Sequence, residues 1–201
     1  MAKVLVLYYS RQGATAALAR RIADGVEQTD QAQLCLRSVP PVRASFEPAS
    51  GSAVPDQGPP YVNKQDLIDC DGLILGSPTR FGAIAAPLKL FLESTSDLWV
   101  SGAMVGKPAA AFTATASLHG GQESTLLGML LPLLHHGMLV TGLPYTESAL
   151  NQTESGGTPY GASRWTGVDG QRAITGDERD LARALGRRVA RLAVRLAGER
   201  T

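Results

Sequence analysis

Blocks of apolar residues separated by amphipathic and polar stretches predict strands that alternate with helices along this chain. A nearly continuous apolar run at 3–9, rich in β-branched and aromatic residues, is typical of a strand covered on both faces. Similar short runs follow at 33–39, 72–76, 109–113 and 138–141. Five such strands, separated by helical segments, predict an α/β fold with a doubly wound parallel five-stranded sheet and helices on both faces.

The segments between these runs carry apolar residues at helical spacing. In the first of them Leu18, Ile22 and Val26 are four residues apart, which indicates one buried helix face. The last segment starts with a capping-box pattern at 175–178, and Leu181 and Leu185 then open its apolar side. We therefore expect a helix after the first strand and a long helix at the end of the chain.

Two stretches break this alternation. Residues 40–63 are rich in proline and show little periodicity, and residues 142–176 are rich in glycine and only weakly periodic. We interpret the first as a surface excursion, because strand-like sequence resumes at once, and the second as a long loop that contacts a neighbouring subunit. The prediction is a single domain over 1–201.

Hydroxyl- and glycine-bearing loops follow the first, third and fourth predicted strands. In the strand order 2-1-3-4-5, the first and third strands flank the point where the winding reverses, so these loops face one crevice. The first loop, at the start of a helix, suits a terminal phosphate, and the other two suit a planar ring. Together they predict a flavin mononucleotide (FMN) site, although an ordinary helix cap and βα turn remain the plain alternatives. The residues concerned are Ser10, Arg11, Gln12, Gly13, Ala14 and Thr15; Pro78, Thr79, Arg80 and Phe81; and the loop 113–121, which begins with Thr113, Ala114, Thr115, Ala116, Ser117 and Leu118.

Composition narrows the classes of function. The formal net charge is +1, which argues against electrostatic capture of nucleic acid. Cys35 and Cys70 lie in apolar runs without metal-binding spacing, and the adjacent His135 and His136 have no third ligand near them in the sequence. These cysteine and histidine positions predict no metal site. No apolar run is long enough for a membrane span. We therefore expect a cytoplasmic protein whose cysteines are reduced.

Several short motifs resemble, in consistent order, the WrbA family of NAD(P)H:quinone oxidoreductases. They cover nearly the whole chain: 2–10, 77–82, 98–103, 119–123, 135–138 and 156–161. The resemblance implies a flavodoxin-like fold, non-covalently bound FMN, a homotetramer and two-electron reduction of quinones to hydroquinols. It also implies ping-pong kinetics, in which NADH or NADPH delivers a hydride and leaves before the quinone binds.

The resemblance also implies roles for individual residues. Residues 10–15 would bind the FMN phosphate, while 78–81 and 113–118 would line the isoalloxazine. His136 would lie at the flavin as the candidate catalytic residue, Trp99 would form part of the substrate pocket, and Gln12 stands where the family often has an aromatic residue that contacts nicotinamide.

Three other functions fit the same flavin site. A flavodoxin-like FMN electron carrier would usually have a strongly acidic docking surface, which this composition does not provide. An FMN reductase or azoreductase would differ only in the second electron acceptor. A regulatory flavoprotein would act through a protein partner, without a basic patch for DNA.

Overall fold

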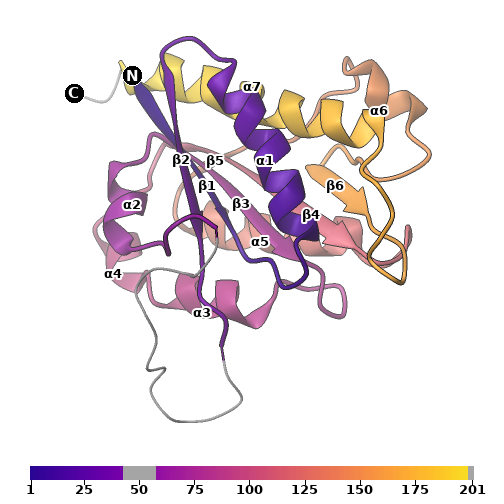
Figure 1. Ribbon diagram of the computed structural model, residues 1–201. Coiled ribbons are helices and arrows are strands. Elements are labelled where there is room, and N and C mark those ends of the chain that lie inside the picture. The colour runs from indigo at the N-terminus through magenta and orange to yellow at the C-terminus, as the bar shows by residue number, and fades with distance from the viewer. Residues whose placement is uncertain (43–57, 199–201) are drawn as a thin grey trace.

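The computed structural model describes residues 1–42 and 58–198 of this chain, and in these ranges one parallel sheet forms the middle layer (Figure 1). The strands are β1 (Ala2–Tyr8), β2 (Ala32–Ser38), β3 (Gly72–Pro78), β4 (Pro108–Thr115), β5 (Leu139–Val140) and β6 (Ala162–Trp165). The main path runs β2-β1-β3-β4-β5, which confirms the predicted order. Every residue of β3 and β4 is buried, as expected for central parallel strands covered on both faces.

The sheet has one strand that the sequence pattern does not predict. β6 pairs with β4 in parallel and lies inside the stretch 142–176. β5 pairs with Pro108 and Ala109 at the start of β4, whereas β6 pairs with Phe112 to Thr115 at its carboxyl end. Two short strands therefore share one edge of β4, and this places the 142–176 stretch beside the carboxyl edge of the sheet.

Helices cover both faces of the sheet, as predicted (Figure 1). They are α1 (Ala14–Glu27), α2 (Lys64–Asp69), α3 (Ala86–Glu93), α4 (Ser96–Val100), α5 (Gln122–His135), α6 (Ser148–Gln152) and α7 (Gly176–Ala197). One apolar core lies between the sheet and α1 and α7, and a second lies on the opposite face beneath α2, α3, α4 and α5. The predicted capping box at Thr175 and Glu178 begins α7.

Helices α1 and α7 lie side by side because glycine allows their backbones to approach closely. A Cβ atom at Gly25 would overlap the carbonyl of Arg183, and one at Gly186 would overlap the carbonyl of Ile22. This contact holds the second half of α1 against α7 and the first core layer.

Three further expectations from the sequence concern the cysteines, membrane-spanning helices and the excursion at 40–63. Cys35 and Cys70 are both buried, and neither forms a disulfide in the described part of the chain. No helix in the ranges 1–42 and 58–198 is long and apolar enough to cross a membrane. Of the excursion predicted at 40–63, residues 43–57 lie outside the described residues.

Candidate functional site

The loops after β1, β3 and β4 meet at the carboxyl edge of the sheet, where ligands of open α/β sheets bind. They surround a cavity of about 140 Å³, which we call the cradle. Its volume suits a phosphate group and is too small for a fused ring system. The cradle is lined by Ser10, Arg11, Gln12, Ala14, Thr15, Pro78, Thr79, Arg80, Ala114, Thr115, Ala116 and Thr166.

The start of α1 forms the anion-binding end of the cradle. Gly13 takes the N-cap position with φ 85° and has no side chain that could cap the helix. Ser10 Oγ accepts a hydrogen bond from Ala16 N at 3.3 Å. Thr15 is only 1% exposed, and its hydroxyl has no partner among the described residues. Unpaired N–H groups, a helix dipole and a free hydroxyl in a cavity without acidic lining residues fit the phosphate of FMN.

The loop after β3 is a tight turn that presents an aromatic ring. Arg80 N donates to Ala83 O at 2.8 Å, and Ala83 N donates to Arg80 O at 3.0 Å. This pairing forces Phe81 into a left-handed conformation, with φ 53°, and leaves its side chain fully exposed. A bulky residue in this conformation costs about 1–3 kcal/mol and is found mainly at functional sites. The exposed ring is well placed for a flavin that projects out of the cradle.

The end of β4 is held by hydrogen bonds inside the chain. Thr113 is completely buried, and its hydroxyl donates to Ser77 O at 2.8 Å, so its side chain faces the sheet and not the cradle. Thr115 Oγ1 accepts from Gln122 Nε2 at 2.9 Å, and Gln122 Oε1 accepts from Ser163 Oγ at 2.6 Å. Gln122 therefore joins the end of β4 to β6 through buried polar contacts.

Strand β6 adds a wall to the cradle that sequence reasoning missed. Thr166, directly after β6, lines the cavity, and its hydroxyl donates to Thr115 O at 3.0 Å. Trp165 Nε1 donates to Ala116 O at 3.0 Å, which ties the loop after β4 to this strand. Glycines on either side, at 161 and 167, were the only sequence signal for this strand.

Glu178 anchors this wall from the first turn of α7. The residue is completely buried, and its Oε1 accepts hydrogen bonds from Ser155 Oγ at 2.7 Å, Gly156 N at 3.0 Å and Trp165 N at 2.9 Å. Its Oε2 accepts from Thr175 N at 3.0 Å. One carboxylate thus holds the 153–156 turn, β6 and the start of α7 together.

Trp99 and His136 lie together in a different place. They line an open apolar hollow of about 420 Å³ between α4 and the end of α5, with Thr95 and Leu131. We call this region the Trp99–His136 surface. Helix α5 starts at the cradle, where Gln122 contacts Thr115, and has 14 residues, so its far end lies about 20 Å away. Within one chain, the structure does not bring Trp99 and His136 to the cradle.

His136 is an incompletely paired polar residue on this surface. A ring nitrogen, Nε2, and Thr95 Oγ1 are 3.1 Å apart, whereas the buried Nδ1 has no hydrogen-bond partner among the described residues. Burial lowers the pKa of His136 below its usual value, and the neighbouring His135 lowers it further. The neutral imidazole is thus favoured, with one nitrogen free to bind another group.

The predicted site residues therefore fall into three groups. The cradle brings together Ser10, Arg11, Gln12, Ala14, Thr15, Pro78, Thr79, Arg80, Ala114, Thr115 and Ala116, with Gly13 capping the helix beside them. Phe81, Ser117 and Leu118 do not line the cavity but lie in the same two loops. Thr113 faces the sheet, and Trp99 and His136 lie at the far end of α5.

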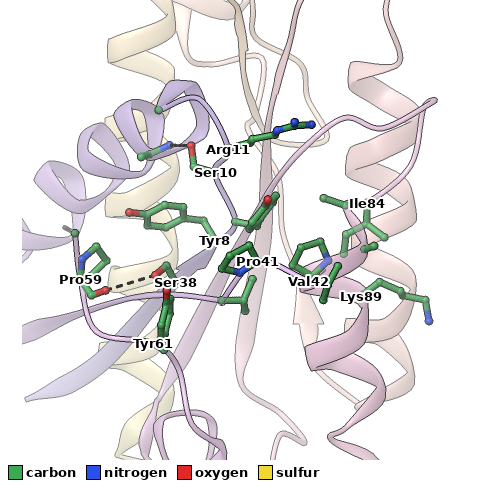
Figure 2. A pocket seen from close by; sticks show the side chains of 18 of the residues that line it. Tyr8, Ser10, Arg11, Ser38, Pro41, Val42, Pro59, Tyr61, Ile84 and Lys89 are labelled. Carbon is green, nitrogen blue, oxygen red and sulfur yellow. Dashed lines mark hydrogen bonds between the residues drawn. The ribbon is translucent and has the colours of Figure 1, made fainter. Parts of the chain in front are cut away.

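A larger cavity adjoins the cradle on the side of β2 (Figure 2). We call it the β1–β2 pocket; its volume is about 1180 Å³, and Tyr8, Arg20, Tyr61 and Lys89 are among its lining residues. It shares Ser10, Arg11 and Arg80 with the cradle. In Figure 2, Ser10 and Arg11 lie at one end and Tyr61 lies at the opposite end, while Lys89 lies on α3 and Ile84 lies just before that helix.

The sequence is similar to those of known proteins. A sequence model of the NADPH-dependent FMN reductase family matches residues 2–148. An NAD(P)H dehydrogenase (quinone) from Sinorhizobium fredii is 44% identical over 201 residues, which cover 98% of this chain and 100% of that protein.

Solved structures support the fold. A flavodoxin-type, WrbA-like protein from Agrobacterium tumefaciens matches with a TM-score of 0.67 and 22% identity, over 97% of this chain and 99% of that one. Flavodoxin 1 from Bacillus cereus matches with a TM-score of 0.60 and 15% identity, over 94% and 98% of the two chains. At these identities the two structures establish the flavodoxin-like fold alone.

Proposed function

The chain belongs to the NADPH-dependent FMN reductase family, and we propose that it is an FMN-dependent NAD(P)H:quinone oxidoreductase that reduces quinones to hydroquinols. The observation that carries this proposal is the cradle, where three loops and a helix start with a glycine at its N-cap converge on a phosphate-sized cavity. The 44% identity to an NAD(P)H dehydrogenase (quinone) supports the choice of donor and acceptor.

The cradle residues would hold FMN non-covalently. The N–H groups at the start of α1, with the hydroxyls of Ser10 and Thr15, would bind the phosphate, and Arg11 and Arg80 would balance its charge. The ring would lie outside the cavity, along Phe81 and the loop at 114–118. Bound FMN supplies the redox chemistry: it takes a hydride from NADH or NADPH and gives two electrons to the quinone in a separate half-reaction.

A second copy of the chain would complete the site. Trp99 is 56% exposed and Leu131 is 60% exposed on the Trp99–His136 surface, and exposed apolar patches of this kind mark interfaces. Because the far end of α5 lies about 20 Å from the cradle, these residues would reach the flavin only from another subunit. We therefore propose a homotetramer in which Trp99 forms a flat wall for the quinone and His136 holds or relays a proton beside the flavin.

A cytoplasmic location fits this proposal. Cys35 and Cys70 are buried and form no disulfide with each other, and cysteines without disulfides are typical of proteins in reducing compartments. NADH and NADPH, the hydride donors in the proposed reaction, are also cytoplasmic reductants.

Flavin binding is the first test. Thr15→Val removes the free hydroxyl in the cradle at nearly constant volume, and it should weaken FMN binding about tenfold, measured by quenching of flavin fluorescence. Thr29→Val is the matched control, because Thr29 is a buried threonine at the other end of α1, where its hydroxyl bonds Gly25 O at 3.2 Å. It should leave FMN affinity unchanged.

Turnover is the second test. The FMN-loaded protein should oxidise NADH or NADPH rapidly only when 1,4-benzoquinone is present. Rapid turnover with free FMN or an azo dye but not with quinone would move the chain to the reductase alternatives. Tight FMN binding without reduction by either nucleotide would support the electron carrier and contradict the proposal.

A further inference from the structure

The β1–β2 pocket combines positive charge with aromatic side chains. Its described lining residues include four cations and no aspartate or glutamate: Arg11, Arg20, Arg80 and Lys89. The whole chain has a net charge of only +1, so this is a local concentration of positive charge. Such a cavity favours a ligand that carries several negative charges.

Only one of these cations is both exclusive to the pocket and free of an ion pair among the described residues. Arg11 and Arg80 also line the cradle, where the FMN phosphate would engage them. Lys89 is paired with Glu93 at 2.9 Å. Arg20 lines only the β1–β2 pocket and has no salt-bridge partner in the part of the chain that the structure describes.

Tyrosines supply flat surfaces beside these charges. Tyr8, Tyr9 and Tyr61 all line the pocket, and Tyr9 and Tyr61 are partly exposed to it. Arg20 is close enough to Tyr8 to oppose the rise that burial causes in the pKa of that phenol. An arginine beside tyrosine rings is suited to a phosphorylated molecule with an aromatic base.

The position of the pocket connects this ligand to the proposed reaction. Since Ser10, Arg11 and Arg80 line both cavities, a molecule in the β1–β2 pocket would lie beside FMN held in the cradle. The volume of about 1180 Å³ is larger than the roughly 300–1,000 Å³ usual for small-molecule sites, so half of a dinucleotide has room.

The charges in the pocket favour one of the two nicotinamide dinucleotides. Sites for NADH usually place an acidic residue at the ribose 2′-hydroxyl, whereas an arginine accommodates the 2′-phosphate of NADPH. We propose that the β1–β2 pocket holds the phosphoadenosine arm of NADPH and that Arg20 selects its 2′-phosphate. This inference rests on the proposed function, because it takes the nicotinamide end of the same molecule to reach the flavin.

Binding of adenosine 2′,5′-bisphosphate, measured by calorimetry, tests the pocket without any turnover. The flavin-loaded protein should bind it at least about tenfold more tightly than adenosine 5′-monophosphate, which lacks the 2′-phosphate. Arg20→Gln should remove most of this difference. Arg21→Gln is the matched control: Arg21 is the next residue of α1, lies outside the pocket, and pairs with Asp24, which keeps Arg183 as a second partner at 3.6 Å.

Steady-state kinetics tests the assignment to NADPH. Arg20→Gln should raise KM for NADPH about tenfold, change KM for NADH by less than about twofold, and leave kcat and FMN affinity unchanged. The bisphosphate should compete with NADPH. If the bisphosphate binds without competing with NADPH, the pocket serves another nucleotide. If Arg20→Gln and Arg21→Gln have equal effects, only the general positive charge matters. Either result overturns the inference.

The two proposals can fail separately. A protein that turns over quinone but prefers neither nucleotide, with no bisphosphate binding, would contradict only the role of the β1–β2 pocket. A protein that binds the bisphosphate through Arg20 but reduces no quinone would contradict the proposed function and leave the phosphoadenosine site in place.

Discussion

The cradle and the Trp99–His136 surface differ in how completely their polar groups are hydrogen-bonded and in how far their apolar side chains are buried. Around the cradle, Gln122 and Glu178 are buried and fully engaged, and they tie β4, β6 and α7 together. On the Trp99–His136 surface the opposite holds: Trp99 is exposed and the buried His136 Nδ1 has no partner among the described residues. A single chain therefore completes the first region, whereas the second has the features of a surface that another copy covers.

The largest effect should follow from removing the carboxylate that supports the cradle. Glu178→Ala leaves the N–H groups of Gly156 and Trp165 buried without an acceptor. We expect a loss of about 4 kcal/mol in the free energy of unfolding, because several buried hydrogen bonds to a charged group are lost together. Urea denaturation measures this loss, and FMN affinity should fall with it, since β6 forms one wall of the cradle.

Glu178→Gln sharpens the same prediction. The amide keeps one acceptor oxygen for Ser155, Gly156 and Trp165 but turns a donor toward the N–H of Thr175. Roughly half of the stability loss should therefore remain. A full loss in Glu178→Gln would mean that the charge matters more than the hydrogen-bond geometry, and no loss in either variant would contradict the role of Glu178 as an anchor.

On the Trp99–His136 surface, a change should affect kinetics more than stability. Trp99→Ala should alter the free energy of unfolding by less than about 0.5 kcal/mol, because the side chain is 56% exposed in the single chain. If a neighbouring subunit presents Trp99 to the quinone, KM for the quinone should rise about tenfold and more than KM for NADH. Equal changes in the two constants, or an active monomer in sedimentation experiments, would contradict the shared site.

A third change acts where the cradle meets solvent, at Phe81. Phe81→Gly releases the left-handed conformation at φ 53°, so the free energy of unfolding should rise by about 1 kcal/mol. FMN affinity should fall about fivefold, because the exposed aromatic ring is lost. Ala83→Gly is a useful control, since it lies in the same turn without positive φ and should bring no such gain in stability. Unchanged FMN affinity in Phe81→Gly would show that the ring faces another partner.

The parts of the fold that could be predicted from the sequence are those that depend on local pattern. Central strands such as β1 and β3 are continuous apolar runs, and the loops after them carry polar residues at a position that the strand order fixes. The capping box of α7 is likewise a local signal. Strand pattern and strand order together are therefore sufficient to locate the cradle.

The parts that could not be predicted depend on contacts between distant segments. β6 has four residues, too few to show a period, and it forms because β4 offers an unpaired edge. Thr113 looked like a cradle residue by position, but strand alternation turns its side chain toward Ser77. The distance between His136 and the cradle follows from the length and direction of α5, which no motif encodes.

The smallest expected effect concerns pH and His136. Because its pKa is lowered in the folded chain, the unfolded chain binds more protons as the pH falls through the ordinary histidine value of about 6.5. The free energy of unfolding should therefore be highest above that pH. It should decrease as the pH falls below that value, until the lower pKa of His136 in the folded chain is passed. His136→Gln should flatten this slope in urea unfolding between pH 7.5 and 5.5, both chosen as about one unit from the ordinary value. His135→Gln should only reduce it, since burial is the larger cause of the shift. Assembly that buries His136 further should steepen the slope at high protein concentration, and a slope independent of concentration would contradict its place in a subunit interface.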